Sequence, residues 1–319
     1  MTFVTPTLLA AIIGFASSAI LGPRIIPLLR KLKIGQSIRE DGPQSHLSKS
    51  GTPTMGGLIF LVGFIIAVVL TGNFSSNVFA ILVSTIGFGL VGYLDDYIKV
   101  VKKRNLGLRA YEKILGQGAV TVFLILYYML YINSESHMII PFVGRTLNFG
   151  ILTIPFLVFV IVGTVNAVNL TDGLDGLATG LSIIVFSAFA FIISKLGYTD
   201  ISASTMGLVG ALIGFLIYNY NPARIFMGDT GSLALGGALA AIAVISGTAL
   251  FIPIIGGIFL AETLSVIIQV GYFKLTHKRF FKMAPLHHHY EQKGWREIKV
   301  VWVFWAVTLL LALIGILAY

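Results

Sequence analysis

Residues 78–99 read VFAILVSTIGFGLVGYLDDYIK. In this stretch an uncharged apolar run ends at two adjacent carboxylates, Asp95 and Asp96, and Lys99 follows them. A run of about 20 apolar residues has the length of a helix that crosses the hydrocarbon core of a bilayer. Carboxylates are costly near lipid, so ionisable groups at the end of such a run indicate a functional site. The stretch therefore predicts a transmembrane helix that carries acidic groups to one membrane face.

The composition of the whole chain agrees with this pattern. Of its 319 residues, 56% are hydrophobic and only 11% are charged, whereas a soluble domain carries roughly 25% charged residues. We therefore expect an all-α polytopic membrane protein that forms a single domain over residues 1–319. The sequence contains no cysteine, which excludes disulfides and thiol chemistry. The first apolar run lacks a basic start and a small-residue cleavage site, so we expect it to remain as a helix.

Hydropathy predicts ten transmembrane helices. They cover about residues 4–23, 54–72, 78–95, 114–132, 151–168, 177–194, 203–219, 232–248, 251–272 and 299–318. With the N-terminus outside, 20 of the 22 lysines and arginines fall in the inside loops, and only Arg145 and Lys195 fall outside. This asymmetry follows the positive-inside rule and supports ten spans, with both termini outside. Eleven of the 13 acidic residues gather on the same inner side, so we expect an active site at the cytoplasmic face.

The net charge of +9 belongs mostly to those inside loops. Basic residues beside transmembrane helices report orientation and attraction to anionic lipid headgroups. We therefore expect membrane lipids as partners and no nucleic acid.

Three polar segments at the ends of predicted spans carry the residue types that handle metal ions and phosphates. Asp95 and Asp96 with their basic neighbours are suited to Mg²⁺ and phosphates, or form a solvated helix end with an i,i+4 ion pair. Residues 166–176, NAVNLTDGLDG, offer amides, carboxylates and two permissive glycines to an enclosed ligand, or form a turn and a helix N-cap. Residues 219–232, NYNPARIFMGDTGS, place Asp229 at a helix N-terminus, as a cap or as the ligand of a metal that bridges a pyrophosphate.

Three further segments carry polar groups near the same face. Glu262 and Gln269 are seven residues apart and share a helix face, where a buried glutamate needs a partner or a water-filled cleft. Residues 285–291, PLHHHYE, contain consecutive histidines that point different ways, so they suit phosphate binding or acid–base chemistry better than zinc ligation. Residues 49–57, KSGTPTMGG, begin with a lysine suited either to clamp a phosphate or to anchor the chain at the interface.

In this order, and over nearly the whole chain, these segments resemble the bacterial phospho-N-acetylmuramoyl-pentapeptide transferases and the wider family of polyprenyl-phosphate N-acetylhexosamine-1-phosphate transferases. The aspartate motifs are shared across the wider family, whereas the PLHHHYE motif is similar to the muramoyl-pentapeptide branch. The resemblance implies Mg²⁺-dependent transfer of phospho-MurNAc-pentapeptide from UDP-MurNAc-pentapeptide to undecaprenyl phosphate, which yields lipid I and UMP in peptidoglycan biosynthesis. It also implies a homodimer with ten helices in the bacterial cytoplasmic membrane.

The same resemblance implies roles for individual residues. Asp229 resembles the family's Mg²⁺ ligand, and Asp95 resembles the residue that deprotonates or orients the lipid phosphate, with Asp96 beside it. The candidate catalytic residues are Asp95, Asp96, Asp229 and His288. The candidate substrate-binding residues are Lys49, Thr54, Lys113, Asn166, Asn169, Asp172, Gly173, Leu174, Asp175, Asn219, Phe226, Gln269, His287 and His289. Direct single displacement is favoured over a phosphorylated Asp229, because a metal-bound carboxylate is a poor nucleophile.

Two alternatives stay open at this point. A related transferase would use UDP-GlcNAc as the donor, and the histidine motif argues against it. An ion-coupled transporter would place carboxylates near the middle of the bilayer. Most acidic residues here lie at span ends on one face, and Glu262 alone is well placed for transport.

Overall fold

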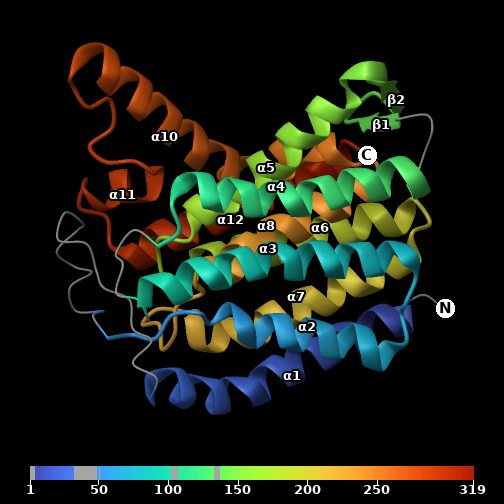
Figure 1. The fold of residues 1–319 in the computed structure, drawn as a ribbon, viewed down its shortest axis with the longest axis horizontal. Helices are drawn as coiled ribbons and strands as arrows, with labels where there is room; N and C mark the ends of the chain where they lie inside the picture. Colours follow the sequence, from blue (N-terminus) through green and yellow to red (C-terminus); the bar gives the residue numbers. More distant parts are fainter. Residues whose placement is uncertain (1–3, 32–48, 50, 101, 103–106, 133–136) are drawn as a thin grey trace.

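The computed structural model describes residues 4–31, 49, 51–100, 102, 107–132 and 137–319. It is a bundle of helices with one short β-hairpin at an end of the bundle (Figure 1). The helices are α1 Val4–Lys31, α2 Gly57–Thr71, α3 Ser76–Val100, α4 Ala110–Tyr127, α5 Thr153–Thr171, α6 Leu177–Lys195, α7 Thr199–Asn219, α8 Gly228–Ile245, α9 Ile252–Ile255, α10 Gly257–Thr276, α11 Leu286–Glu291 and α12 Glu297–Leu317. The hairpin pairs β1 His137–Ile140 with β2 Arg145–Asn148 in antiparallel register.

Nine of the ten predicted spans each overlap one α-helix, and the predicted span 251–272 is the exception. Nine helices in the described part of the chain are long and apolar enough to cross a membrane, and α2 is an apolar helix of 15 residues. The protein is therefore a multi-pass membrane protein, and a tenth crossing by α2 stays a prediction. The predicted span 251–272 is divided, because the chain leaves α-helical geometry at Gly256 between α9 and α10.

Helix α8 forms the centre of the bundle. Every residue from Thr230 to Ile245 is buried. Its many glycines and alanines let neighbouring helices approach closely, as is common between membrane helices. A Cβ on Gly236 would lie 2.5 Å from the Cα of Val165 in α5, and one on Gly237 would lie 2.3 Å from the Phe88 ring in α3.

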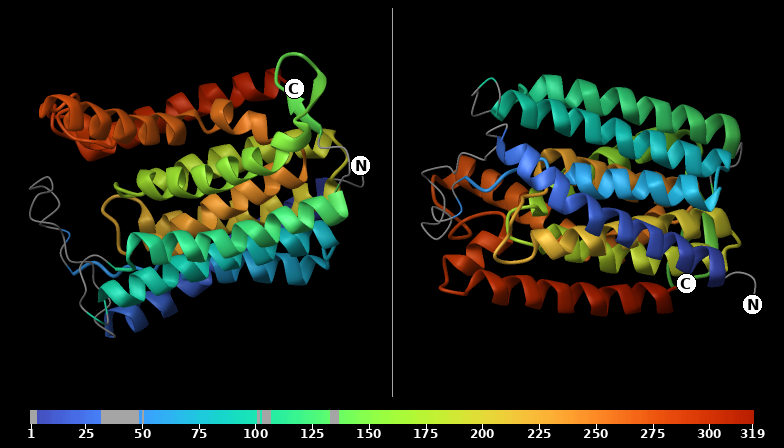
Figure 2. Two further views of the ribbon diagram at one scale, coloured as in Figure 1. Left: turned by 45° about the horizontal axis from the view of Figure 1, so that its top comes forward. Right: turned by 90° about the horizontal axis from the view of Figure 1, so that it is seen from below.

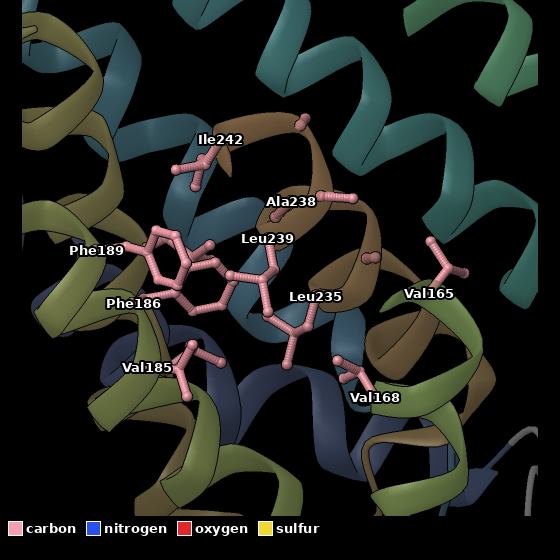
Figure 3. Close-up of a cluster of buried hydrophobic side chains, with 14 of the residues drawn as sticks. Val165, Val168, Val185, Phe186, Phe189, Leu235, Ala238, Leu239 and Ile242 are labelled. Carbon is pink, nitrogen blue, oxygen red and sulfur yellow. The ribbon is translucent and has the colours of Figure 1, made fainter. Parts of the chain in front are cut away.

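Larger apolar side chains fill the space around this small-residue surface. Figure 3 shows Leu235, Ala238, Leu239 and Ile242 of α8 between α5 and α6. The labelled partners are Val165 and Val168 of α5, and Val185, Phe186 and Phe189 of α6. This packing fixes the start of α8 relative to α3 and α5, the helices that carry the acidic motifs.

The β-hairpin is an element that the all-α expectation misses. Ile139 donates its backbone N–H to the Gly247 carbonyl at 2.9 Å, and Phe142 donates to the Ala318 carbonyl at 2.6 Å. Its strands have four residues each, too short for a periodic pattern to separate them from a loop. The hairpin, the start of α1 and the C-terminus lie at one end of the bundle, away from α11 (Figures 1 and 2).

Candidate functional site

The Asp229 carboxylate, in the first turn of α8, is the point where three other helices meet. Its Oδ2 lies 2.8 Å from the Lys99 ammonium of α3 and 3.0 Å from the Lys113 ammonium of α4. Its Oδ1 accepts a hydrogen bond from Asn169 Nδ2 of α5 at 2.8 Å. The side chain is 18% exposed, so this carboxylate is held in place while part of its surface stays open.

Asp96 has a different environment from its neighbour Asp95. It is buried and accepts three hydrogen bonds from the start of α8: from the Asp229 backbone N at 3.2 Å, and from the Thr230 backbone N and hydroxyl at 2.9 and 2.7 Å. The first N–H groups of a helix have no partner within the helix. The carboxylate of Asp96 thus caps α8 from another helix and sets the position of Asp229.

Asp95 pairs with the ammonium of Lys99. Its Oδ2 lies 2.5 Å from Lys99 Nζ, and its Oδ1 accepts a hydrogen bond from the Leu108 backbone N at 2.8 Å. The i,i+4 ion pair that the spacing suggests is therefore present. Lys99 connects Asp95 with Asp229, so one ammonium lies between the two carboxylates.

Asp172 is the C-cap residue of α5, and its carboxyl group is close enough to the acidic cluster of Asp95, Asp96 and Asp229 to be affected by its charges. Burial, and then the charges of Asp229, Asp96 and Asp175, raise the pKa of Asp172 to about 8. In the described part of the chain no side-chain hydrogen bond or ion pair offsets this charge. Asp172 is therefore mostly protonated near neutral pH when no cation lies in the cluster, which has four carboxylates and two lysines.

A polar face of α4 lies against a polar face of α5. Lys113 Nζ is 3.4 Å from Asn169 Oδ1, and one turn further Gln117 exchanges hydrogen bonds with Asn166 at 2.9 and 3.4 Å. Asn169 also donates to the Ser232 hydroxyl of α8 at 2.8 Å. The structure thus places three predicted residues together and adds Gln117, which sequence reasoning missed. The signal was available, because Lys113 and Gln117 are four residues apart on one helix face.

A second charged cluster surrounds Lys49. Its ammonium lies 2.7 Å from Asp175 Oδ1 and 2.6 Å from Glu297 Oε1. The other oxygen of Asp175 accepts hydrogen bonds from Asn221 Nδ2 at 3.1 Å and the Ala223 backbone N at 3.0 Å. Lys49 is therefore bound by two carboxylates within the protein. Sequence reasoning missed Glu297, since it looked like an ordinary acidic residue in the first turn of a helix.

The three consecutive histidines have three different environments, as their spacing predicts. His287 is buried, and its backbone N and Nδ1 lie 3.2 and 3.1 Å from Glu262 Oε1. His288 Nδ1 lies 2.8 Å from Glu291 Oε2. His289 Nδ1 accepts a hydrogen bond from the Lys282 backbone N at 3.1 Å.

The charges around His289 also affect its titration. Burial, and then the positive charges of Lys293 and Lys282, lower the pKa of this histidine. It is therefore neutral at pH values where an ordinary histidine is partly protonated.

The position of the His287 imidazole explains why residue 173 is a glycine. A Cβ at Gly173 would lie 2.2 Å from His287 Nε2, so only glycine leaves room for the ring. The loop 172–176 also links the two clusters, because Asp172 is affected by the charges of the acidic cluster and Asp175 pairs with Lys49.

The remaining predicted residues lie at packing positions or support loops. Thr54 and Leu174 are buried. Asn219 accepts a hydrogen bond from Thr179 Oγ1 at 2.6 Å and donates to the Ile225 carbonyl at 3.1 Å. Phe226 is half-buried, and its backbone pairs with Pro53 and Gly56. Gln269 accepts a hydrogen bond from the Phe281 backbone N at 2.8 Å. Their contacts with a substrate stay predictions.

Comparison with known proteins identifies the family to which this chain belongs. The model of glycosyl transferase family 4 matches residues 78–247, and the phospho-N-acetylmuramoyl-pentapeptide-transferase signature 1 matches residues 49–61. These segments contain Asp95, Asp172 and Asp229 in the first case and Lys49 in the second.

Curated relatives cover the whole chain. The phospho-N-acetylmuramoyl-pentapeptide-transferase of Clostridioides difficile (strain 630) is 51% identical over 100% of this chain and 99% of its own length. That of Clostridium botulinum (strain Alaska E43 / Type E3) is 53% identical over 99% and 97%, and that of Staphylococcus carnosus (strain TM300) is 52% identical over 96% and 97%. The chain therefore belongs to the phospho-N-acetylmuramoyl-pentapeptide-transferase family, and it is a membrane-bound phosphoglycosyl transferase of peptidoglycan biosynthesis.

Proposed function

We propose that this enzyme transfers phospho-MurNAc-pentapeptide from UDP-MurNAc-pentapeptide to undecaprenyl phosphate, with release of UMP and formation of lipid I. The observation that carries the proposal is the convergence on Asp229 of Lys99, Lys113 and Asn169 from three other helices. Both substrates are anionic, so repulsion between their phosphates is the main obstacle to reaction. Two ammonium groups fixed beside a carboxylate are suited to reduce that repulsion.

The charge of the cluster fits a divalent cation. Mg²⁺ prefers oxygen ligands, retains waters and is usually held by one or two carboxylates together with substrate phosphates. Within the described ranges, no group of three or more histidine, cysteine, aspartate or glutamate side chains is arranged to hold a metal. The charged groups of the cluster are the carboxylates of Asp95, Asp96, Asp172 and Asp229 and the ammoniums of Lys99 and Lys113. The formal charge is −2 when all four carboxylates are ionised. Because the pKa of Asp172 is raised to about 8, that state is reached near neutral pH only with a cation bound nearby.

Asp229 is the residue that would hold Mg²⁺, because its carboxylate is partly exposed and the carboxylates of Asp95 and Asp172 act on it electrostatically. When bound there, Mg²⁺ supplies positive charge to the pyrophosphate oxygens and to the departing phosphate. The remaining work belongs to the chain. Asp96 fixes the start of α8, and Asn169 orients one carboxylate oxygen of Asp229.

In the proposed reaction an oxygen of the lipid phosphate forms a bond to the sugar-linked phosphorus. The pyrophosphate P–O bond breaks, and UMP leaves with the electron pair. One phosphoanhydride replaces another, so the step needs no separate energy source. A phosphate monoester, whose second pKa is about 6, is already largely ionised near neutral pH. Asp95, held by Lys99, is therefore suited to orient the acceptor phosphate rather than to act as an obligatory base.

The surroundings of Asp229 support direct displacement over a covalent intermediate. One of its carboxylate oxygens lies beside two ammoniums, and the other accepts a hydrogen bond from Asn169. Electron density drawn toward these donors makes the carboxylate a weak nucleophile. Trapping a phosphosugar on Asp229 in the absence of the lipid acceptor would overturn this assignment.

The remaining parts of the proposal follow from the sequence. We place the site at the cytoplasmic face of the bacterial cytoplasmic membrane, with both termini outside and the enzyme as a homodimer. The positive-inside count supports the orientation. Glu262, the residue best placed for ion transport, is paired with His287.

The test is UMP release by the purified full chain in lipid bilayers with undecaprenyl phosphate and Mg²⁺. Wild type should release UMP with UDP-MurNAc-pentapeptide and not with UDP-GlcNAc, and removal of Mg²⁺ should abolish turnover. Asp229→Asn keeps the shape of the side chain but removes its charge, so we expect at least about a 10²-fold loss of kcat. Turnover with UDP-GlcNAc alone would refute the donor assignment, and full activity of Asp229→Asn would refute the site.

A further inference from the structure

Glu297, in the first turn of α12, joins segments that are far apart in the sequence. Its Oε1 lies 2.6 Å from Lys49 Nζ and accepts a hydrogen bond from the Asp175 backbone N at 2.8 Å. Its Oε2 accepts a hydrogen bond from Asn221 Nδ2 at 3.2 Å. One carboxylate thus contacts the segment before α2, the loop before α6 and the loop before α8.

The charges in this cluster depend on one another. The single ammonium of Lys49 lies between two carboxylates, and the side chains of Lys49, Asp175 and Glu297 are only 17%, 2% and 15% exposed. Ion pairs with so little solvent access are weakly screened. Removal of Glu297 would leave Lys49 with one of its two anionic partners. Removal of Lys49 would leave Asp175 and Glu297 as neighbouring carboxylates without their common cation.

The cluster is connected to the acidic site through a short loop. Asp175 lies three residues from Asp172, whose carboxylate is in the field of Asp229. Gly173 between them lies against the His287 ring. A shift of Asp175 therefore moves a loop that borders the acidic cluster and the histidine motif.

We propose that Glu297 is a positioning residue of the enzyme, which acts through Lys49 and Asp175 to hold the loop 172–176 in its working position. The choice of activity assay rests on the proposed function. Glu297 itself is assigned no contact with the substrate.

The first experiment replaces Glu297 by glutamine, which keeps the volume of the side chain and removes its charge. We expect kcat/KM for the nucleotide donor to fall by about tenfold or more, as for other residues that orient a site from behind. Most of this change should lie in KM for the donor, while KM for the lipid acceptor at saturating donor stays within twofold. An equal change in both KM values, or none, would overturn the proposal.

Asp200→Asn is the matched control. Asp200 accepts a hydrogen bond from Ser75 on its carboxylate and one from Asn73 Nδ2 on its backbone oxygen, at 2.6 Å. This carboxylate lies at the start of α7, at the opposite end of the bundle from the loop that begins α6. Asp200→Asn removes the charge of this carboxylate, so it should lower the unfolding temperature and leave the KM values for the donor and the lipid acceptor unchanged. A donor KM effect as large as that of Glu297→Gln would overturn the proposal, because it would reflect general destabilisation.

A double-mutant cycle tests the coupling without any substrate. Glu297→Gln should lower the unfolding temperature of the wild type by a few degrees. In a Lys49→Met background the same change should leave that temperature unchanged or raise it, since it removes repulsion from Asp175. Additive decreases would overturn the coupling whatever reaction the enzyme performs. If the wild type releases no UMP while the cycle is non-additive, the proposed function fails and the coupling through Lys49 stands.

Discussion

Replacement of Gly92 by alanine tests whether the contact between α3 and α8 determines activity. An ideal Cβ on Gly92 would lie 2.0 Å from the Asp229 carbonyl oxygen and 2.7 Å from the Thr230 nitrogen. Real Cβ atoms essentially never come within 3.0 Å of such atoms, so the helices must separate by about 1 Å or more. The hydrogen bonds to Asp96 from the Thr230 and Asp229 N–H groups, now 2.9 and 3.2 Å, would then exceed the normal range.

The expected size of the effect follows from these contacts. A hydrogen bond to a charged group contributes about 1.5–3 kcal/mol, so loss of two costs about 3–6 kcal/mol of folding free energy. Displacement of Asp229 by about 1 Å should lower kcat by about 10²-fold, although Gly92→Ala alters no charge. Thermal unfolding measures the first quantity, and UMP release in bilayers measures the second.

Gly163→Ala provides the control for this substitution. Gly163 lies within α5, and a Cβ there would meet no atom within 4 Å. Alanine should therefore stabilise the helix by about 0.5–1 kcal/mol and leave UMP release unchanged. Wild-type activity and stability in Gly92→Ala would refute the reasoning, because the tight approach of α3 to α8 would then not determine the position of Asp229.

Two further predictions concern the loop before α6. Gly173→Ala should displace the His287 ring and reduce UMP release, because a Cβ at position 173 would lie 2.2 Å from His287 Nε2. UMP release and NMR of labelled histidine measure the two effects. Unchanged activity together with an unmoved ring would contradict this prediction. Asp172 has a pKa raised from 3.8 to about 8, so the folded protein binds a proton that the unfolded chain has lost. Without Mg²⁺, stability should therefore fall as the pH rises from about 4 to about 8, and Asp172→Asn should remove that part of the slope in thermal unfolding. A slope of the same size in Asp172→Asn would show that other groups cause it.

Some features of the site could be predicted because they depend on neighbouring residues in the sequence. The i,i+4 pair of Asp95 and Lys99 follows from helical spacing, and it is present. The divergent directions of the three histidines follow from their adjacency, and each has a different partner. The family assignment from the ordered motifs is confirmed by the family models and the full-length relatives.

Other features depend on contacts between distant residues. Asp95 and Asp96 look alike in the sequence, but their environments differ. Asp96 is buried and caps α8 through Thr230, which lies 134 residues later in the chain. In the sequence Lys49 looks like a lysine that is available to bind a phosphate. In the structure it pairs with Glu297, which lies 248 residues later in the chain. Local periodicity contains no information on such pairs, since they depend on which helices pack together.

The amino-acid sequence by itself determined that this protein is a multi-pass helical membrane transferase, because apolar runs must form helices in lipid and polar motifs must gather where those helices end. Only the tertiary structure decided which polar residues share a site. The close packing of α3 and α5 against the small residues of α8 brings Asp95, Asn169 and Asp229 together. The start of α12 brings Glu297 to Lys49. These pairings depend on packing and hydrogen bonds, which act only over short distances in space. They join residues that are far apart in the sequence.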